Sequence, residues 1–582
     1  MRTRGSEHIS HGEQITITFD GQPILARRNE TIAAALTAAG VRDLRRTANG
    51  AARGVFCGMG VCQDCLVTID GRPNLRACMT KIDRPVAVQR QTPRPEVTGL
   101  QPNEAHWSQL QTLTPEVLVI GGGAAGLAAA TALRRYGVDV VLVDERPTPG
   151  GQYFKQLAAS ADLQPERFAD RQMAKGETRL RAAQDAGVRM LSGAEISAVF
   201  DPLYFVAISG SSVRLILPKR VVVATGAYEQ GSPVPGWTLP GVMTTGAAQT
   251  FLRSYRVAPG RRVIVAGNGP LNLQVALELT RVGVVIVAIA ELAEAPWRAP
   301  PGALRDMLLG SASLTAKGLA LCGEIAARRI PVHYGAKLGR IEQTDGGLRV
   351  QLAAATGEPR GGALEADVVI MGYGFAPANE ILRLLGCRSA ESTNGKPPVI
   401  ERTSTFETSV SGVYAVGDCA GLAGGQAAEI EGALAGLAIA GDLGKADRQA
   451  LLKLTSKLSR QLARHRRFQS GLWRVHSSPA EALDATHAES IICRCEEITL
   501  GAIESAIADG ASMFGSLKRQ TRMGMGRCQA RYCTAHAVTA LRAQPHGLRD
   551  SYLAWAPRPP VKPLPIGLLA SLELDDDGDA VA

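Results

Sequence analysis

The sequence predicts an α/β protein with a core of two dinucleotide-binding units and a small cysteine-bearing domain at each end. Two observations predict the core: a buried strand, a glycine turn and a helix follow one another from residue 117 and again from residue 262. A third predicts the flanking domains. Four of the eleven cysteines lie within residues 57–78 and four within 493–533. Two such sets indicate two metal centres rather than a disulfide framework.

Composition places the chain among ordinary globular enzymes. Its 582 residues suggest about four domains at ~150 residues each. The N-terminus lacks the apolar core of a signal peptide, and no apolar run approaches the ~18 residues of a membrane span, so we expect a cytoplasmic protein with no membrane span. The net charge is +10, but the basic residues are scattered and aromatic residues are only 4%, so we expect no nucleic-acid partner.

The order of these features predicts the division of the chain. The expected segments are a cysteine-bearing α+β domain (1–95), a linker (96–114), the first nucleotide-binding domain in two parts (115–230 and 365–442), the second nucleotide-binding domain (231–364), a helical spacer (443–485), a second cysteine-bearing domain (486–556) and a tail (557–582).

The N-terminal domain carries the first cysteine set. Residues 14–19 alternate like a half-buried strand, and residues 31–39 read as a short helix. The string CGMGVCQDC has the C-x4-C-x2-C spacing of plant-type 2Fe-2S ferredoxins, and Gly58 and Gly60 supply the backbone freedom for a tight loop. The predicted ligands are Cys57, Cys62, Cys65 and Cys78, with a zinc site as the alternative. The string resembles the ferredoxin-like domain of amino-acid and opine dehydrogenase complexes.

The first nucleotide-binding unit begins with a buried strand at 117–120. Gly121, Gly123 and Gly126 form G-x-G-x-x-G before a helix at 127–136, and a pyrophosphate would lie at that helix's N-terminus. A second strand at 138–143 ends in two acids that can accept ribose hydroxyls. FAD and NAD both fit. The next residues, GGQ ending at Gln152, resemble two-domain flavoprotein disulfide reductases and their relatives, which implies FAD with Glu145 as the ribose ligand.

Two later motifs complete that unit. Residues 221–226 end in Thr225 and Gly226 and resemble the strand end that closes the FAD domain of this superfamily. Residues 408–418 end in Gly417 and Asp418 and match its second FAD fingerprint, which implies that Asp418 binds the ribityl or phosphate end. No cysteine pair lies beside these motifs, which excludes disulfide-reductase chemistry; Cys419 is interpreted as a packed small residue.

The second unit departs from the fingerprint. Its turn carries Gly267 and Gly269, but Asn272 replaces the third small residue, and Glu291 ends the next strand. The larger asparagine holds the helix farther from the strand. Three alternatives stay open: bound NAD, bound ATP or another adenine nucleotide, and a structural duplicate without ligand.

The C-terminal domain carries the second cysteine set. A C-x-C pair and a C-x4-C pair flank a predicted helix at 498–507; the pairs are Cys493 with Cys495 and Cys528 with Cys533. This arrangement resembles bacterioferritin-associated ferredoxin, a small helical 2Fe-2S domain, with a wider final pair. Zinc is again the alternative. Because the flavin unit lies between the two cysteine-bearing domains in the chain, we expect the two clusters on either side of the isoalloxazine ring.

Most of the chain resembles the α subunits of the group containing opine oxidase, hydrogen cyanide synthase, dye-linked proline dehydrogenase and heterotetrameric sarcosine oxidase, with a ferredoxin-like domain fused at the N-terminus. The resemblance implies FAD, two 2Fe-2S clusters and an FMN at a subunit interface. It also implies a partner β subunit similar to D-amino-acid oxidase, where the CH–NH bond of a secondary amino acid is oxidised, and an external quinone-like or dye-like electron acceptor. We therefore expect an electron-transfer subunit without catalytic residues of its own.

Two other readings stay open. One is a stand-alone NAD(P)H-dependent FAD and iron–sulfur reductase, which Asn272 disfavours. The other is a non-catalytic scaffold whose cofactors stabilise a partner.

Overall fold

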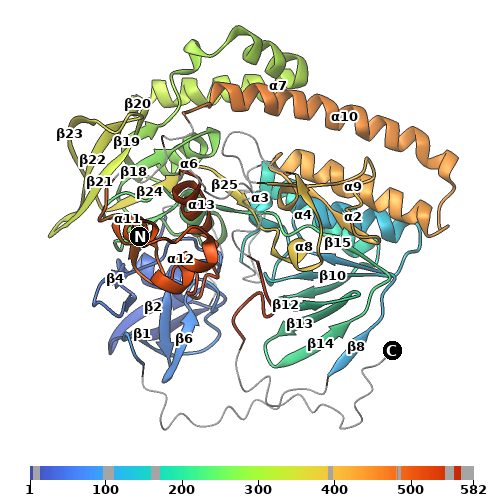
Figure 1. Ribbon diagram of the computed structural model, residues 1–582, viewed down its shortest axis with the longest axis horizontal. Coiled ribbons are helices and arrows are strands. Elements are labelled where there is room, and N and C mark those ends of the chain that lie inside the picture. Colours follow the sequence, from blue (N-terminus) through green and yellow to red (C-terminus); the bar gives the residue numbers. More distant parts are fainter. Residues whose placement is uncertain are drawn as a thin grey trace.

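The computed structural model describes residues 1–3, 13–95, 110–158, 171–390, 398–479, 482, 487–543 and 556–564 (Figure 1). Most of the predicted linker and the tail beyond 564 lie outside the described residues. The α/β core with a small domain from each end of the chain is confirmed. The two end domains lie side by side, with the C-terminal helices next to the N-terminal sheet.

The N-terminal domain is a five-stranded sheet with one short helix. The strand order is β2-β1-β7-β5-β6. The elements are β1 (Gln14–Phe19), β2 (Gln22–Arg27), α1 (Ile32–Ala38), β3 (Arg45–Arg46), β4 (Ala52–Arg53), β5 (Leu66–Ile69), β6 (Arg72–Arg76) and β7 (Ala87–Arg90). The predicted strand at 14–19 is confirmed and buries alternate residues. Helix α1 begins after Thr31, whose Oγ1 accepts a hydrogen bond from the Ala34 N–H at 3.3 Å.

A parallel sheet forms the first nucleotide-binding unit, in the order β11-β10-β9-β15-β28. Every residue of its central strand, β9, is buried, as a continuous apolar run predicts. The elements are β9 (Val117–Ile120), α2 (Ala124–Arg135), β10 (Val140–Asp144), α3 (Gly151–Phe154), α4 (Arg171–Asp185), β11 (Arg189–Ser192), β15 (Arg220–Val223), β28 (Val413–Ala415) and α9 (Gly425–Asp442). Helix α2 starts three residues before the predicted position.

The two faces of this sheet are covered differently. Helices α2 and α9 cover one face and approach so closely that a Cβ on Gly432 would overlap the Ala125 carbonyl oxygen. A mixed sheet, β12-β13-β14-β8, in which only β8 runs parallel to its neighbour, packs on the other face and shares an apolar cluster with β9 and β10. Its strands are β8 (Gln111–Leu113), β12 (Glu195–Phe200), β13 (Tyr204–Ser209) and β14 (Ser212–Ile216).

The second unit repeats the parallel design, in the order β17-β24-β18-β19-β20, with an antiparallel three-stranded sheet β21-β22-β23. The elements are β17 (Val242–Thr244), α5 (Thr245–Tyr255), β18 (Arg262–Gly267), α6 (Pro270–Arg281), β19 (Val285–Glu291), β20 (Val332–Tyr334), β21 (Ala336–Thr344), β22 (Gly347–Ala354), β23 (Pro359–Ala366) and β24 (Val368–Gly372). The antiparallel pair β16 (Ala227–Glu229) and β25 (Phe375–Pro377) joins the two units. The N-terminal domain packs on α5.

Two long helices, α7 (Pro301–Ala327) and α10 (Arg448–Val475), pack on one another along one side of the core (Figure 1). Helix α10 lies within the segment 443–485 that we expected to be a helical spacer, whereas α7 was not predicted. Beyond α10 lie β29 (Ile491–Cys493), β30 (Ile498–Thr499), α11 (Leu500–Ala508), α12 (Phe514–Thr521) and α13 (Thr534–Arg542). Among the described residues, no helix combines the length and the apolarity that crossing a membrane requires.

Candidate cofactor-binding sites

The predicted residues of the first unit meet at one edge of its parallel sheet. Ile120 pairs with Val143 on one side and with Val223 on the other, and Val223 pairs with Ala415. The residues that follow these strands therefore lie at the same carboxyl edge, where nucleotides bind in open α/β sheets. They are Gly121, Gly123, Gly126, Asp144, Thr225, Gly226, Gly417 and Asp418.

The glycine turn fits a dinucleotide. Gly121 has a φ of +103°, and a Cβ there would overlap the Ala224 carbonyl oxygen. A Cβ at Gly126 would overlap the Gly121 carbonyl oxygen, so only glycine lets α2 lie this close to the turn. No side chain caps the first turn of α2 at Gly123. The N–H groups of the first turn of α2 can therefore bind a pyrophosphate.

The two acids at the end of β10 have different partners. Asp144 is buried, and its carboxylate accepts hydrogen bonds from the N–H groups of Gly122 at 2.6 Å and Arg146 at 2.7 Å. Burial raises the pKa of Asp144 to about 6. Glu145 forms an ion pair with Lys562, whose Nζ also lies 3.5 Å from Glu195 Oε2. Asp144 is thus the acid beside the glycine turn.

The other predicted FAD contacts surround the same turn. Asp418 Oδ1 accepts hydrogen bonds from the N–H groups of Ala423 and Gly424, both at 2.9 Å, just before α9, and burial raises its pKa. Thr225 Oγ1 donates to the Ala378 carbonyl at 2.6 Å. A Cβ at Gly151 would lie 2.9 Å from Gly123 Cα, so α3, which carries Gln152, packs against the turn. These residues fit a bound FAD.

Cys419 follows Asp418, and it is fully buried. Its thiol donates to the carbonyls of Val223 and Val416, each at 3.3 Å. These contacts confirm the interpretation of Cys419 as a packed small residue.

In the second unit, the buried side chain of Asn272 forms hydrogen bonds within the protein. It is 2% exposed, its Oδ1 accepts from Thr245 Oγ1 at 2.7 Å, and its Nδ2 donates to the Gly372 carbonyl at 2.9 Å. The asparagine therefore joins α6 to α5 and β24 in the place where a glycine would let the helix approach.

The acid of the second unit is also enclosed. Glu291 is 2% exposed, and its two carboxylate oxygens each lie 3.2 Å from the Gly269 N–H. His476, directly after α10, places its Nδ1 3.6 Å from Glu291 Oε1, and its carbonyl accepts a hydrogen bond from Asn268 Nδ2 at 3.0 Å. The end of α10 therefore covers the Gly267–Gly269 turn.

The four N-terminal cysteines are buried and lie in two pairs. The thiols of Cys57 and Cys62 are hydrogen-bonded, as are those of Cys65 and Cys78. Two thiolates per iron is the ligation that a 2Fe-2S cluster requires. The N–H groups of Met59 and Cys62 point at Cys57 Sγ, at 3.5 and 3.3 Å.

The loop and its electrostatics match this role. Gly58 and Gly60 have φ values of +61° and +77°, which confirms that the loop needs glycine there. Burial raises the pKa of Cys57, but hydrogen bonds from Cys62 and from backbone N–H groups outweigh it and lower the pKa to about 7. These hydrogen bonds favour the thiolate of Cys57, the form that binds metal.

The C-terminal cysteines are paired in the same way, Cys493 with Cys533 and Cys495 with Cys528. The hydrogen bond from Cys533 lowers the pKa of Cys493 to about 7 against the effect of burial. A Cβ at Gly526 would overlap the Cys495 side chain, so the loop passes directly over that cysteine. Within the described residues, no three His, Cys, Asp or Glu side chains form a site for a single metal ion.

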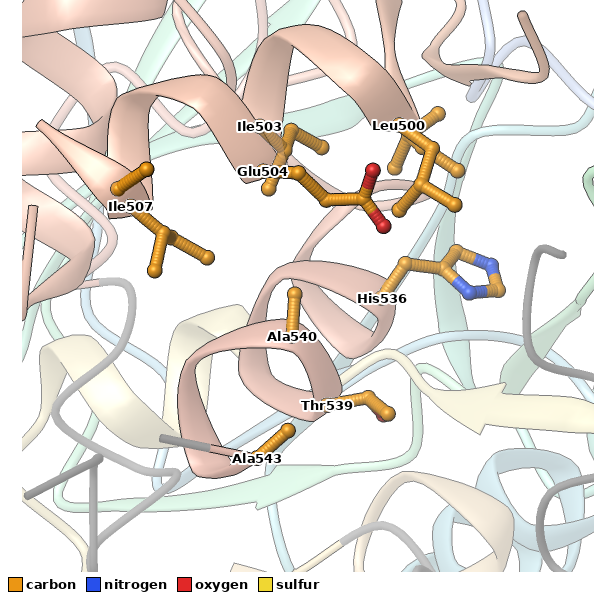
Figure 2. Close-up of a pocket in the computed structure, with 10 residues that line it drawn as sticks. Leu500, Ile503, Glu504, Ile507, His536, Thr539, Ala540 and Ala543 are labelled. Carbon is orange, nitrogen blue, oxygen red and sulfur yellow. The ribbon is translucent and has the colours of Figure 1, made fainter. Parts of the chain in front are cut away.

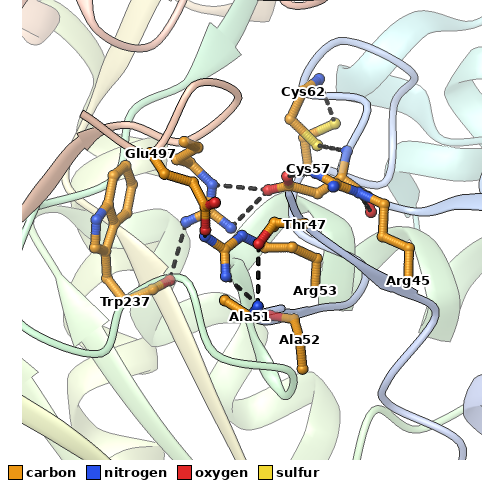
Figure 3. A network of polar contacts seen from close by, with 11 residues as sticks. Arg45, Thr47, Ala51, Ala52, Arg53, Cys57, Cys62, Trp237 and Glu497 are labelled. Carbon is orange, nitrogen blue, oxygen red and sulfur yellow. Dashed lines mark hydrogen bonds and ion pairs between the residues drawn. The ribbon is translucent and has the colours of Figure 1, made fainter. Parts of the chain in front are cut away.

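The two cysteine sets are neighbours. Cys57, Cys62, Cys528 and, at its edge, Cys495 belong to one apolar cluster. Asp64 forms an ion pair with Arg494 at 2.7 Å, and Arg53 forms another with Glu497 at 2.8 Å. Figure 3 shows Arg53 and Glu497 close to Trp237, near Cys57 and Cys62. The expectation of clusters on opposite sides of the flavin is therefore wrong, because folding brings the two ends of the chain together.

A separate pocket of about 350 Å³ lies in the C-terminal domain between α11 and α13. Its wall is mostly apolar, with Glu504 from α11 and His536 from α13 as its ionisable residues (Figure 2). None of the eight cysteines lines it. The pocket is therefore distinct from the cysteine sites.

Comparison with known proteins agrees with the three-part architecture. Residues 12–93 match the family described as 2Fe-2S iron-sulfur cluster binding domain, residues 115–436 match pyridine nucleotide-disulphide oxidoreductase, and residues 491–543 match BFD-like [2Fe-2S] binding domain. The crystal structure of L-proline dehydrogenase from P. horikoshii has the same fold, with a TM-score of 0.70 and 21% identity over 96% of this chain and 98% of that one.

Three relatives carry the comparison further. The chain is 33% identical to the A subunit of opine oxidase from Agrobacterium tumefaciens (strain Ach5) over 475 residues, which are 78% of this chain and 92% of the relative. It is 32% identical to hydrogen cyanide synthase subunit HcnB of Pseudomonas aeruginosa PAO1 over 467 residues, 78% of this chain and 98% of the relative. A stretch of 80 residues, 14% of this chain, is 48% identical to subunit HcnA of the same organism and covers 77% of it.

Fold, cofactor sites and relatives together define a subunit of a multi-subunit flavin and 2Fe-2S oxidoreductase. Within that class, the chain belongs to the family that contains the A subunit of opine oxidase and the HcnB subunit of hydrogen cyanide synthase. The resemblance identified from the sequence is confirmed.

Proposed function

We propose that the chain is the electron-transfer subunit of a flavin-dependent amino-acid or opine dehydrogenase. In this proposal a partner subunit similar to D-amino-acid oxidase oxidises the CH–NH bond of a secondary amino acid at its own FAD. This chain takes up the electrons and delivers them to an external quinone-like or dye-like acceptor. An FMN at the interface with the partner belongs to the proposal.

One observation carries the proposal: relatives that are two separate subunits, HcnB and HcnA, both match this single chain. The HcnA match has nearly the length of the N-terminal domain, which the Arg53–Glu497 ion pair holds against the C-terminal domain. A chain that unites two such subunits is suited to electron transfer within one polypeptide.

Each cofactor has assigned residues in this proposal. The glycine turn at Gly121–Gly126 and the start of α2 hold the FAD pyrophosphate. Asp144 binds the ribose, and Asp418 binds the ribityl end. Glu145 is not assigned to FAD because it forms an ion pair with Lys562. One 2Fe-2S cluster is held by Cys57, Cys62, Cys65 and Cys78, and the other by Cys493, Cys495, Cys528 and Cys533. A flavin accepts two electrons and releases them singly, and each cluster carries one.

A reducing, cytoplasmic location is part of the proposal. All eleven cysteines are free thiols, eight of them in the cluster sites. Disulfides are rare in the cytosol, where thiols stay reduced.

The test compares the purified chain alone with its complex with a candidate FAD-containing partner. Secondary amino acids and an artificial dye are supplied to both. We expect turnover by the complex only, with bleaching of this chain's flavin during turnover. Robust amine oxidation by the single chain would contradict the proposal.

The alternative, a stand-alone NAD(P)H reductase, requires a nucleotide at the second unit. The enclosure of Glu291 by Gly269 and His476 argues against it. Reduction of the isolated chain by NADH within a turnover time would favour this alternative.

A further inference from the structure

One ion pair links the two cysteine motifs directly. Asp64 stands between Cys62 and Cys65, and Arg494 stands between Cys493 and Cys495. Arg494 Nη2 lies 2.7 Å from Asp64 Oδ2, and Arg494 Nε donates to the same oxygen at 2.8 Å. The two side chains are only 1% and 4% exposed. The contact is therefore a buried bridge from one set of predicted ligands to the other.

Aromatic side chains hold this bridge in place. The Arg494 guanidinium lies 3.8 Å from the ring centroid of Phe56, the residue before Cys57, and 4.5 Å from that of Trp237. Its Nη1 donates to the Trp237 carbonyl at 2.9 Å. Arg45 adds a second cation, 3.1 Å from the other Asp64 oxygen. Both charges are thus fixed by several contacts.

A tyrosine from the second cysteine loop also reaches the first set. Tyr532, between Cys528 and Cys533, packs edge-on against Phe56 with a centroid distance of 5.6 Å. It is 3% exposed, and its hydroxyl has no hydrogen-bond partner among the described residues. Cys57, Cys62 and Cys528 are all close enough to act on that hydroxyl electrostatically. A buried donor without a partner is rare unless a ligand is missing.

We propose that Asp64, Arg494 and Tyr532 are positioning residues that hold the two 2Fe-2S clusters as one adjacent pair, between which an electron passes directly rather than through the flavin. The exchange moves one electron, so one cluster is oxidised as the other is reduced, and no proton or leaving group is involved. The inference rests on the proposed presence of both clusters, but it does not depend on the partner subunit or the substrate.

The two fixed charges predict the direction in which the midpoint potentials of the clusters shift when either charge is removed. A reduced cluster is more negative than an oxidised one, so the Asp64 carboxylate disfavours reduction and the Arg494 guanidinium favours it. Because the pair lies between the two motifs, each charge acts on both clusters.

The first experiment uses the unaltered, cluster-loaded chain. A reductive titration is followed by electron paramagnetic resonance, in which a 2Fe-2S cluster gives a signal only when it is reduced. We expect the signal of the first reduced cluster to broaden and to relax faster once the second is reduced. Two signals that stay independent through full reduction would overturn the proposal.

The second experiment changes one charge at a time and measures both midpoint potentials. Asp64→Asn should raise the two potentials and Arg494→Gln should lower them. Tyr532→Phe removes only the unpaired hydroxyl, so folding is preserved, and the loss of this buried donor beside the cysteines should lower the potentials. The matched control is Asp70→Asn, which removes the carboxylate of the exposed Arg84–Asp70 pair in the same domain and should shift neither potential.

The outcomes separate this inference from the proposed function. If the two signals stay independent, the clusters are not an adjacent pair and the inference fails. If the three variants leave both potentials unchanged, the residues have only a structural role and the inference fails as well. If magnetic interaction is present but the complex oxidises no amine, the inference stands and the proposed function fails.

Discussion

Arg53 Nη2 lies 2.8 Å from Glu497 Oε1, and the two side chains are 2% and 8% exposed (Figure 3). The pair joins the N-terminal domain to the loop that follows Cys495, across 444 positions of sequence. Together with Asp64–Arg494 it makes two buried ion pairs at one junction. The two end domains are therefore joined by buried charges as well as by apolar contacts.

Breaking this pair should weaken the contact between the N-terminal and C-terminal domains. Glu497→Gln leaves the Arg53 charge buried without its partner, which costs about 3–5 kcal/mol. We expect a lower midpoint in urea unfolding. The control is Glu489→Gln, which removes the exposed partner of Arg340 in the same region and should change stability by about 0–1 kcal/mol. Equal effects of the two variants would contradict the prediction.

The two acids after β10 should differ in their effect on flavin binding. Asp144→Asn weakens the carboxylate contacts at the glycine turn, and hydrogen bonds to a charged group are worth about 1.5–3 kcal/mol. We expect roughly ten- to hundredfold weaker FAD binding by the deflavinated chain. Glu145→Gln should bind FAD nearly as the wild type does, because Glu145 pairs with Lys562. A larger loss with Glu145→Gln would restore Glu145 as the ribose ligand.

The second nucleotide unit should not bind NADH. Glu291 is enclosed by Gly269 and His476, and Asn272 fills the helix–strand contact. We expect no heat of binding in calorimetric titration with millimolar NADH, and none with ATP. Micromolar binding of either nucleotide, abolished by Glu291→Gln, would contradict this prediction.

Lys155 should make stability depend on pH. Its Nζ donates to the Gly246 carbonyl at 2.8 Å, and burial lowers its pKa from 10.5 to about 7, against the attraction of Glu229. Between about pH 7 and 10.5 the unfolded chain binds a proton that the folded chain does not. The free energy of unfolding should therefore rise with pH in this window, by at most about 1.4 kcal/mol per pH unit.

Lys155→Met tests this prediction when unfolding is measured across the window. The variant should lose the pH-dependent contribution of the lysine to stability. The difference in free energy of unfolding between the variant and the wild type should therefore change steadily between pH 7 and 10. The exposed Lys453→Met is the control and should leave the slope unchanged. A constant difference between Lys155→Met and the wild type would show that the lysine stays protonated in the folded state.

The sequence predicted those parts of the fold that depend on short-range patterns. The strand–turn–helix at β9 and α2 and the two glycines of the first cysteine loop follow from neighbouring residues, and each is confirmed. Helix α7 escaped prediction because it is mostly exposed. Only Ala303, Met307, Thr315 and Ile325 are buried along its 27 residues, too few to give a periodic apolar face.

Long-range relations could not be predicted from one sequence. Asp64 and Arg494 are 430 positions apart, and no local pattern reports an ion pair over that separation. The ribose acid illustrates a finer limit. Register pairs Gly267 with Glu291 in the second unit, and Ile120 with Val143 in the first, which makes Asp144 the counterpart of Glu291. Asp144 and Glu145 are adjacent in the sequence, and the sequence alone does not show which of them lies beside the glycine turn.

Residues 556–564 return from the C-terminal domain to the flavin unit, where Val561 N–H donates to the Ser197 carbonyl at 2.8 Å and Lys562 pairs with Glu145. During synthesis on the ribosome, Glu145 emerges more than four hundred residues before its partner. The nascent flavin unit therefore folds at first without this ion pair, which can form only after the residues around Lys562 have been synthesised.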